Sequence, residues 1–158
     1  MVYRFKASIP GNKIFMREYE VKGSITLYSL HLYLQNDLGF APDQMVLFRA
    51  LNSKGKVKKE FGLFNLGDGA MDSVSIESIY NEGYSLLEYV YDIFKVRSLQ
   101  LEILSTEEES AKRAYPRLVA ERGKNPDQFS DNYDDFEYMI EPSEDEELYI
   151  SEDNAPDS

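Results

Sequence analysis

The chain has 158 residues and a formal charge of −12, from 29 acidic and 17 basic residues, and it contains no cysteine. This length fits one domain with an extension, and the lack of cysteine excludes disulfides, thiolate metal sites and cysteine nucleophiles. Residues 127–158 hold 13 of the acidic residues and no lysine or arginine, whereas residues 1–126 have a balance of +1. The sequence therefore predicts a near-neutral domain over residues 1–128 and an acidic, aromatic tail over residues 129–158, and it excludes a generally basic nucleic-acid clamp.

The first third of the chain changes from strand patterns to a helix pattern. Residues 2–9 place an apolar side chain at every second position, and a turn sequence at 10–13 leads to a second strand at 14–21, so we expect a hairpin. Residues 27–38 have helical spacing, with Ser24 or Thr26 as the candidate N-cap and Gly39 as the stop signal. Short strands are predicted at 45–50 and 57–61, on either side of a basic turn.

The rest of the chain continues this mixture. A glycine-rich loop is predicted at 62–69, a short helix after Ser75, and a second hairpin from strands at 86–92 and 96–104. Thr106 and Glu109 fit a capping box, so we expect a brief helix that ends before Pro116. The sequence thus predicts an α+β fold: an antiparallel or mixed sheet built from two hairpins, packed against one main helix and short helices. A soluble cytoplasmic protein is expected, because no signal peptide or membrane-length apolar run is visible.

Several stretches follow one another in an order that suggests a family. They are Tyr3 to Lys6, Arg17, Thr26 to Phe40, Tyr89 to Asp92, and Tyr115 to Leu118 followed by Gly123 and 126–128. On these residues the chain resembles the plasmid pRiA4b ORF-3-like family over residues 2–129. That family usually continues its tyrosine-aspartate strand with phenylalanine, glycine, aspartate and a tryptophan, where this chain has Ile93, Phe94, Lys95 and Arg97. The resemblance implies an α+β domain of unassigned function, met on plasmids and transposable elements, and no catalytic activity.

Three residues are candidates for catalysis. His31, the only histidine, falls on the apolar stripe of the predicted helix, which favours a hydrogen-bonded core residue over a general base or zinc ligand. Glu88 and Asp92 could form an acid and base pair, but a solvated Glu88 and a turn-capping Asp92 are favoured. We therefore predict no catalytic residue, metal or cofactor. A hydrolase-like enzyme that uses Glu88, Asp92 and His31 is the last alternative.

Three sets of residues could contact a ligand or partner. The first, suggested mainly by the family resemblance, comprises Arg17, His31, Tyr89, Tyr91, Asp92, Tyr115 and Arg117. The second is a basic hairpin that could touch phosphates or simply protect a sheet edge, and it comprises Lys54, Lys56, Lys58 and Lys59. The third interleaves with the acids of the tail and comprises Phe129, Tyr133, Phe136, Tyr138 and Ile140. Helical spacing in this third set predicts that residues 129–141 pack on the domain.

The leading functional hypothesis is a non-enzymatic binding or adaptor domain whose acidic tail regulates it or contacts a protein with a basic surface. The alternative is a mobile-element-associated nucleic-acid-binding factor, in which the lysine hairpin contacts phosphates and the tail competes as an anionic mimic. The near-zero charge of residues 1–126 argues against strong nucleic-acid binding, because little counterion release is available.

Overall fold

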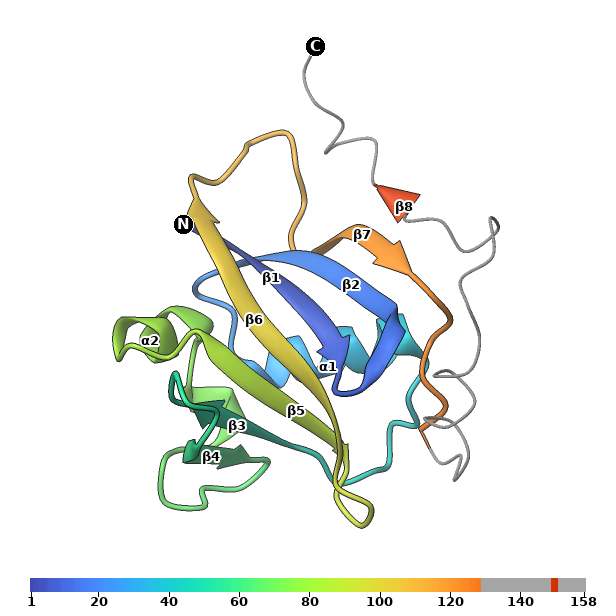
Figure 1. Ribbon diagram of the computed structural model, residues 1–158. Helices are drawn as coiled ribbons and strands as arrows, with labels where there is room; N and C mark the ends of the chain where they lie inside the picture. Colours follow the sequence, from blue (N-terminus) through green and yellow to red (C-terminus); the bar gives the residue numbers. More distant parts are fainter. Residues whose placement is uncertain (129–148, 151–158) are drawn as a thin grey trace.

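The computed structural model describes residues 1–128 and 149–150, and these form an α+β fold around one antiparallel sheet (Figure 1). Its strands are β1 (Val2–Ile9), β2 (Asn12–Lys22), β3 (Leu47–Leu51), β4 (Val57–Gly62), β5 (Leu86–Asp92), β6 (Arg97–Glu107) and β7 (Arg117–Arg122). Their order is β4-β3-β5-β6-β1-β2-β7, and a two-residue strand, β8 (Tyr149–Ile150), pairs with the outer edge of β7. The helical elements are α1 (Leu27–Leu38), α2 (Ile76–Asn81) and a 3₁₀ turn, η1 (Met71–Ser73).

The main core lies between the sheet and these helices, with α1 lying across one face of the sheet (Figure 1). The alternation of β1 holds, because Tyr3, Phe5 and Ala7 join this core. The apolar stripe of α1 is buried against them, and Leu34 has no exposed surface. Each fully buried leucine contributes about 1.5–3 kcal/mol of transfer free energy, so this face fixes the helix on the sheet.

The predicted helix boundaries are confirmed by their caps. Thr26, not Ser24, caps α1, since its side chain accepts a hydrogen bond from the Ser29 amide at 3.1 Å. Gly39 ends the helix with a φ of 71°, in the left-handed region that favours glycine. Ser75 caps α2 in the same way.

The expectation of a sheet built from two hairpins is only partly correct. Both predicted hairpins are present, β1–β2 and β5–β6, but β3 and β4 form a third antiparallel pair and β7 extends the sheet beside β2. All pairings between these strands are antiparallel, so the mixed alternative is not realised. The β7 strand was not predicted, because its short segment contains charged residues at both ends.

The helix predicted after Thr106 is wrong. The β6 strand continues to Glu107, and Thr106 lies opposite Tyr3 of β1. Thr106 is held in the β1–β6 ladder instead of at a helix start, and this long-range pairing overrides the local signal. Residues 108–116 contain no helix.

A smaller apolar cluster of Met16, Val119 and Ala120 accompanies the β2–β7 pairing, whose register shifts between Glu18 and Tyr19. Within the described part of the chain, no helix is long and apolar enough to cross a membrane.

Candidate functional site

His31 is a hydrogen-bonded core residue. Its Nδ1 lies 2.7 Å from the hydroxyl oxygen of Tyr89, and only 5% of the His31 side chain is exposed. Burial lowers the pKa of His31 below its ordinary value and raises the pKa of Tyr89. A neutral imidazole bonded to a neutral phenol stabilises the contact between α1 and β5, which agrees with the interpretation favoured by the sequence.

The three candidate catalytic groups do not converge. Glu88 forms an ion pair with Arg49 at 4.0 Å, and it alternates with Tyr89 along β5, so it points away from the face that holds His31. Asp92 accepts a hydrogen bond from the Lys95 amide at 3.2 Å and thereby caps the β5–β6 turn, as expected. The register between β5 and β6 is interrupted between Val90 and Asp92, so Asp92 does not continue the regular alternation from Glu88.

Arg17, one of the residues predicted for a ligand or partner surface, is buried in the sheet with 2% exposure. Its guanidinium donates to the carbonyl oxygens of Met16, Arg122 and Gly123 at 2.7–2.9 Å. It also donates to the Asn125 side chain at 2.9 Å. Arg17 therefore holds the chain that follows β7 against β2.

Arg117 and Tyr115 lie in separate surroundings. Arg117 donates to the buried carboxylate of Glu20 at 2.6 Å, and Arg113 lies 3.8 Å from the same oxygen. The Tyr115 hydroxyl accepts a hydrogen bond from the Ser110 amide at 3.3 Å. Tyr115 also lines a hollow of about 150 Å³ at the end of β2, together with Lys22 and Pro116. The residues grouped by the sequence thus occupy several places in the fold.

Gln128, which entered the sequence analysis only as part of the family segment 126–128, joins two distant segments. Its Nε2 donates to the Tyr91 carbonyl oxygen at 3.0 Å, and its Oε1 accepts a hydrogen bond from the Ala41 amide at 2.8 Å. The Tyr91 ring stacks on Phe40 with 4.5 Å between centroids. Gln128 is buried, so the chain is fixed beside β5 immediately before the acidic segment begins. The family segment was the available signal, but it did not indicate which groups Gln128 would bond.

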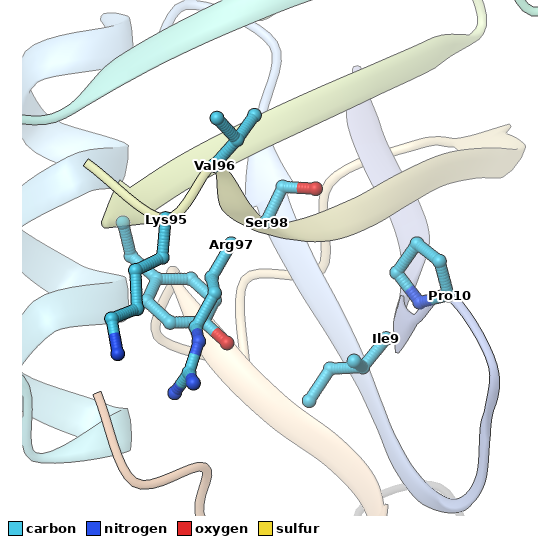
Figure 2. Close-up of a pocket in the computed structure, with 7 residues that line it drawn as sticks. Ile9, Pro10, Lys95, Val96, Arg97 and Ser98 are labelled. Carbon is cyan, nitrogen blue, oxygen red and sulfur yellow. The ribbon is translucent and has the colours of Figure 1, made fainter. Parts of the chain in front are cut away.

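A hollow of about 310 Å³ opens between the tips of the β1–β2 and β5–β6 hairpins, beside Tyr91 (Figure 2). It is lined by Ile9, Pro10, Tyr91, Lys95, Val96, Arg97 and Ser98. Figure 2 shows the Lys95 and Arg97 side chains extending to the same side of the β5–β6 turn. The charged groups at this hollow are cationic, which makes it a candidate for binding an anion.

The lysine hairpin is present as predicted, between β3 and β4. Lys54, Lys56 and Lys58 are exposed, whereas Lys59 bonds to the Glu82 carboxylate at 2.8 Å. That hydrogen bond raises the pKa of Lys59. A hollow of about 230 Å³ includes Lys58 and Lys59 together with the carboxylates of Glu60 and Asp68, so the hairpin is less cationic than its lysines alone suggest.

Among residues 1–128 and 149–150, no group of three or more histidine, aspartate or glutamate side chains is placed to hold a metal ion. The predicted contacts of Phe129, Tyr133, Phe136, Tyr138 and Ile140 lie outside the described residues.

The model of the family described as plasmid pRiA4b ORF-3-like protein matches residues 2–154. The chain belongs to this family. The match confirms the resemblance seen in the sequence, and it continues through most of the acidic segment. No curated protein matches the chain.

Among solved structures, the chain is similar to a protein of unknown function, MM3350, from Methanosarcina mazei Go1. The two share 18% sequence identity with a TM-score of 0.67, over 78% of this chain and 70% of the other. At this identity the likeness supports a common fold.

Proposed function

We propose that this chain is a cytoplasmic, non-enzymatic binding domain whose acidic C-terminal segment contacts a protein with a basic surface. The observation that carries this proposal is the anchoring of Gln128 to both β5 and the segment after α1. Everything after this residue carries a charge of −12 without a single lysine or arginine, whereas the preceding domain is nearly neutral. The acidic segment is therefore attached at a fixed point of a balanced fold.

This arrangement suits recognition through electrostatic steering. A block of like charge attracts a partner of opposite sign over distances of about one Debye length, near 8 Å at physiological salt. Attraction of this kind raises association rates and makes binding salt-dependent. Because the acids are concentrated in one segment, a basic partner would meet a locally strong field that an evenly distributed charge would not produce.

A binding role also fits the positions of the reactive side chains. His31 is held in the core by Tyr89, Glu88 is paired with Arg49 and Asp92 caps a turn. General acid–base catalysis needs groups within hydrogen-bond reach of one substrate, and these three residues face different surroundings.

Affinity capture from a cell lysate tests the proposal with the full chain and two charge-matched variants. The tail variant carries Glu144→Gln, Asp145→Asn, Glu146→Gln and Glu147→Gln. The control removes four exposed carboxylates of the domain through Asp72→Asn, Glu102→Gln, Glu107→Gln and Glu108→Gln.

We expect partners with basic surfaces to bind the native chain and the control, and to be lost from the tail variant and at high salt. The same set of partners on all three proteins would contradict the proposed role of the segment.

The alternative, a mobile-element-associated nucleic-acid-binding factor, is favoured by the exposure of Lys54, Lys56 and Lys58 on one hairpin. Phe64, 76% exposed in the loop after β4, adds a ring on which a base could stack. A mobility-shift assay with single-stranded DNA tests this function. Binding should disappear when the three lysines become glutamine and should persist when exposed Lys6, Lys13 and Lys112 are changed instead. Equal loss in both variants would contradict a specific hairpin interface.

A further inference from the structure

Arg97 differs from the other arginines of the described chain in having no partner. Its Nη1 is buried and makes no hydrogen bond. The buried Nε atoms of Arg17 and Arg49 also lack hydrogen bonds, but they lie 3.7 and 3.5 Å from carboxylate oxygens. Among residues 1–128, Arg97 is the one arginine with neither an acceptor nor a carboxylate within ion-pair distance. A buried donor without a partner is costly, so an acceptor from a ligand would remove a cost that the fold bears.

Arg97 lies at the hollow between the two hairpin tips. Lys95 and the Ser98 side chain line the same hollow, which is large enough for a small ligand at about 310 Å³. Asp92, although opposite Arg97 in the β5–β6 pairing, is engaged with the Lys95 amide and is not within ion-pair distance of the Arg97 guanidinium. The hollow is thus lined by an arginine whose Nη1 makes no hydrogen bond, together with a lysine and a serine, and these residue types suit an oxyanion.

The turn keeps these groups together through an unusual backbone. Val96, between the two cationic residues, has a φ of 54°, which is a steric outlier for a β-branched side chain. Val96 is the last residue of the turn at 93–96 that joins β5 to β6, and Figure 2 shows the Lys95 and Arg97 side chains extending to one side while Val96 points elsewhere. A backbone conformation of this kind costs about 1–3 kcal/mol, and such strained residues cluster at ligand sites.

We infer that the hollow between the β1–β2 and β5–β6 tips binds an oxyanion, a phosphate or carboxylate group, with Arg97 as the main ligand-binding residue and Lys95 beside it. This site belongs to the domain itself and stands independently of the function proposed for the acidic segment. Two sources could supply the group: a separate phosphate-bearing molecule, or a carboxylate from residues 129–158. The second source begins directly after Gln128, which is hydrogen-bonded to Tyr91, a residue that lines the hollow.

A titration of the ¹⁵N-labelled full chain with inorganic phosphate, followed by NMR at neutral pH and constant ionic strength, tests the site. We expect saturable shifts of the amide signals of residues 95–98. Arg97→Gln should weaken phosphate binding by roughly 10- to 100-fold, the effect of losing a hydrogen bond to a charged group. Arg97→Lys, which keeps the charge and loses the planar donor pair, should weaken it less. Lys54→Gln removes one positive charge from the distant β3–β4 turn and should leave binding unchanged.

The variant with four neutralised tail acids (residues 144–147) distinguishes the two sources. Tighter phosphate binding by this variant would show that carboxylates of the chain compete for the hollow, whereas unchanged binding would assign it to a separate molecule. Either result supports an oxyanion site. The inference is overturned if neither protein shows saturable shifts at residues 95–98, or if Arg97→Gln weakens binding no more than Lys54→Gln does.

Discussion

Replacing Arg17 by methionine should destabilise the fold strongly, because the methionine fills part of the space but offers no hydrogen-bond donor. The variant leaves the carbonyl oxygens of Met16, Arg122 and Gly123 without the bonds of 2.7–2.9 Å that Arg17 supplies. A hydrogen bond to a charged group contributes about 1.5–3 kcal/mol. The bonds share one guanidinium and are not additive, so we expect a loss of about 3–5 kcal/mol, as for other broken buried charge contacts.

Arg4 provides the matched control on the neighbouring strand. Its guanidinium makes two hydrogen bonds to the Glu18 carboxylate, at 2.7 and 3.1 Å, but its side chain is 31% exposed. Water can replace these contacts, so Arg4→Met should cost no more than about 1 kcal/mol.

Urea unfolding followed by far-ultraviolet circular dichroism measures both free energies, and the slope of the transition checks that both variants unfold as one unit. Hydrogen exchange adds a local measurement: in Arg17→Met, the amides of residues 123–128 should exchange faster than in Arg4→Met. The reasoning is refuted if the two variants lose equal stability, or if the loss in Arg17→Met leaves exchange in that segment unchanged.

Three further predictions concern the core, the turn and the buried histidine. Leu34→Ala should lower the free energy of unfolding by about 2–5 kcal/mol because its side chain is fully buried, whereas Leu32→Ala, 42% exposed on the same helix, should change it by about 0.5 kcal/mol or less in urea titrations. Val96→Gly should raise the melting temperature, because it relieves about 1–2 kcal/mol of left-handed strain and costs only about 0.5–1 kcal/mol of backbone entropy. The control Val57→Gly, in the regular strand β4, should lower the melting temperature. Burial lowers the pKa of His31 in the folded chain below the 6.5 of an unfolded histidine. Between the folded and unfolded pKa values the unfolded chain binds more protons, so the free energy of unfolding should fall as the pH drops below about 6.5. Unfolding curves at several pH values should show a smaller fall for His31→Gln.

Elements with a strong local pattern could be predicted from the sequence. The apolar side chains that recur every second residue in β1 all lie on its buried face, and Leu27, Leu30 and Leu34 all lie on the buried face of α1. In both elements the local pattern and the tertiary packing therefore agree. The core position of His31 followed from the same stripe. The structure adds its partner, the Tyr89 hydroxyl, which lies far along the chain and is visible only once α1 rests on β5.

Features that depend on long-range backbone pairing could not be predicted. The Thr106 capping-box signal was overruled because β6 pairs with β1 from Gln100 to Glu107. The position of β7 depends on the free edge of β2, which no local pattern specifies. Most partners of Arg17 are carbonyl oxygens. Since every residue carries a carbonyl group, the sequence gives no sign of which ones a buried arginine will meet.

The hollow at the hairpin tips shows the same limit. Lys95 and Arg97 are two residues apart, a spacing that in a strand places both on one face, but here Lys95 belongs to the turn and Arg97 begins β6. Their common direction depends on the left-handed backbone of Val96, which no rule for β-branched residues would predict.

The order of the strands also has a consequence for how the protein is made. The β1 strand pairs with β2 at once, but its other neighbour, β6, follows only after β3, β4, β5 and both helices. Roughly 90 residues lie between β1 and β6. At a synthesis rate of about 5–20 residues per second, β6 is therefore made about 5–20 seconds after β1. During that interval one edge of the nascent N-terminal hairpin offers unpaired amides and carbonyls to any neighbouring chain. Arg4 and Lys6 alternate with the apolar residues of β1. They place positive charge along this unpaired edge of β1, which would discourage its pairing with another copy of the chain.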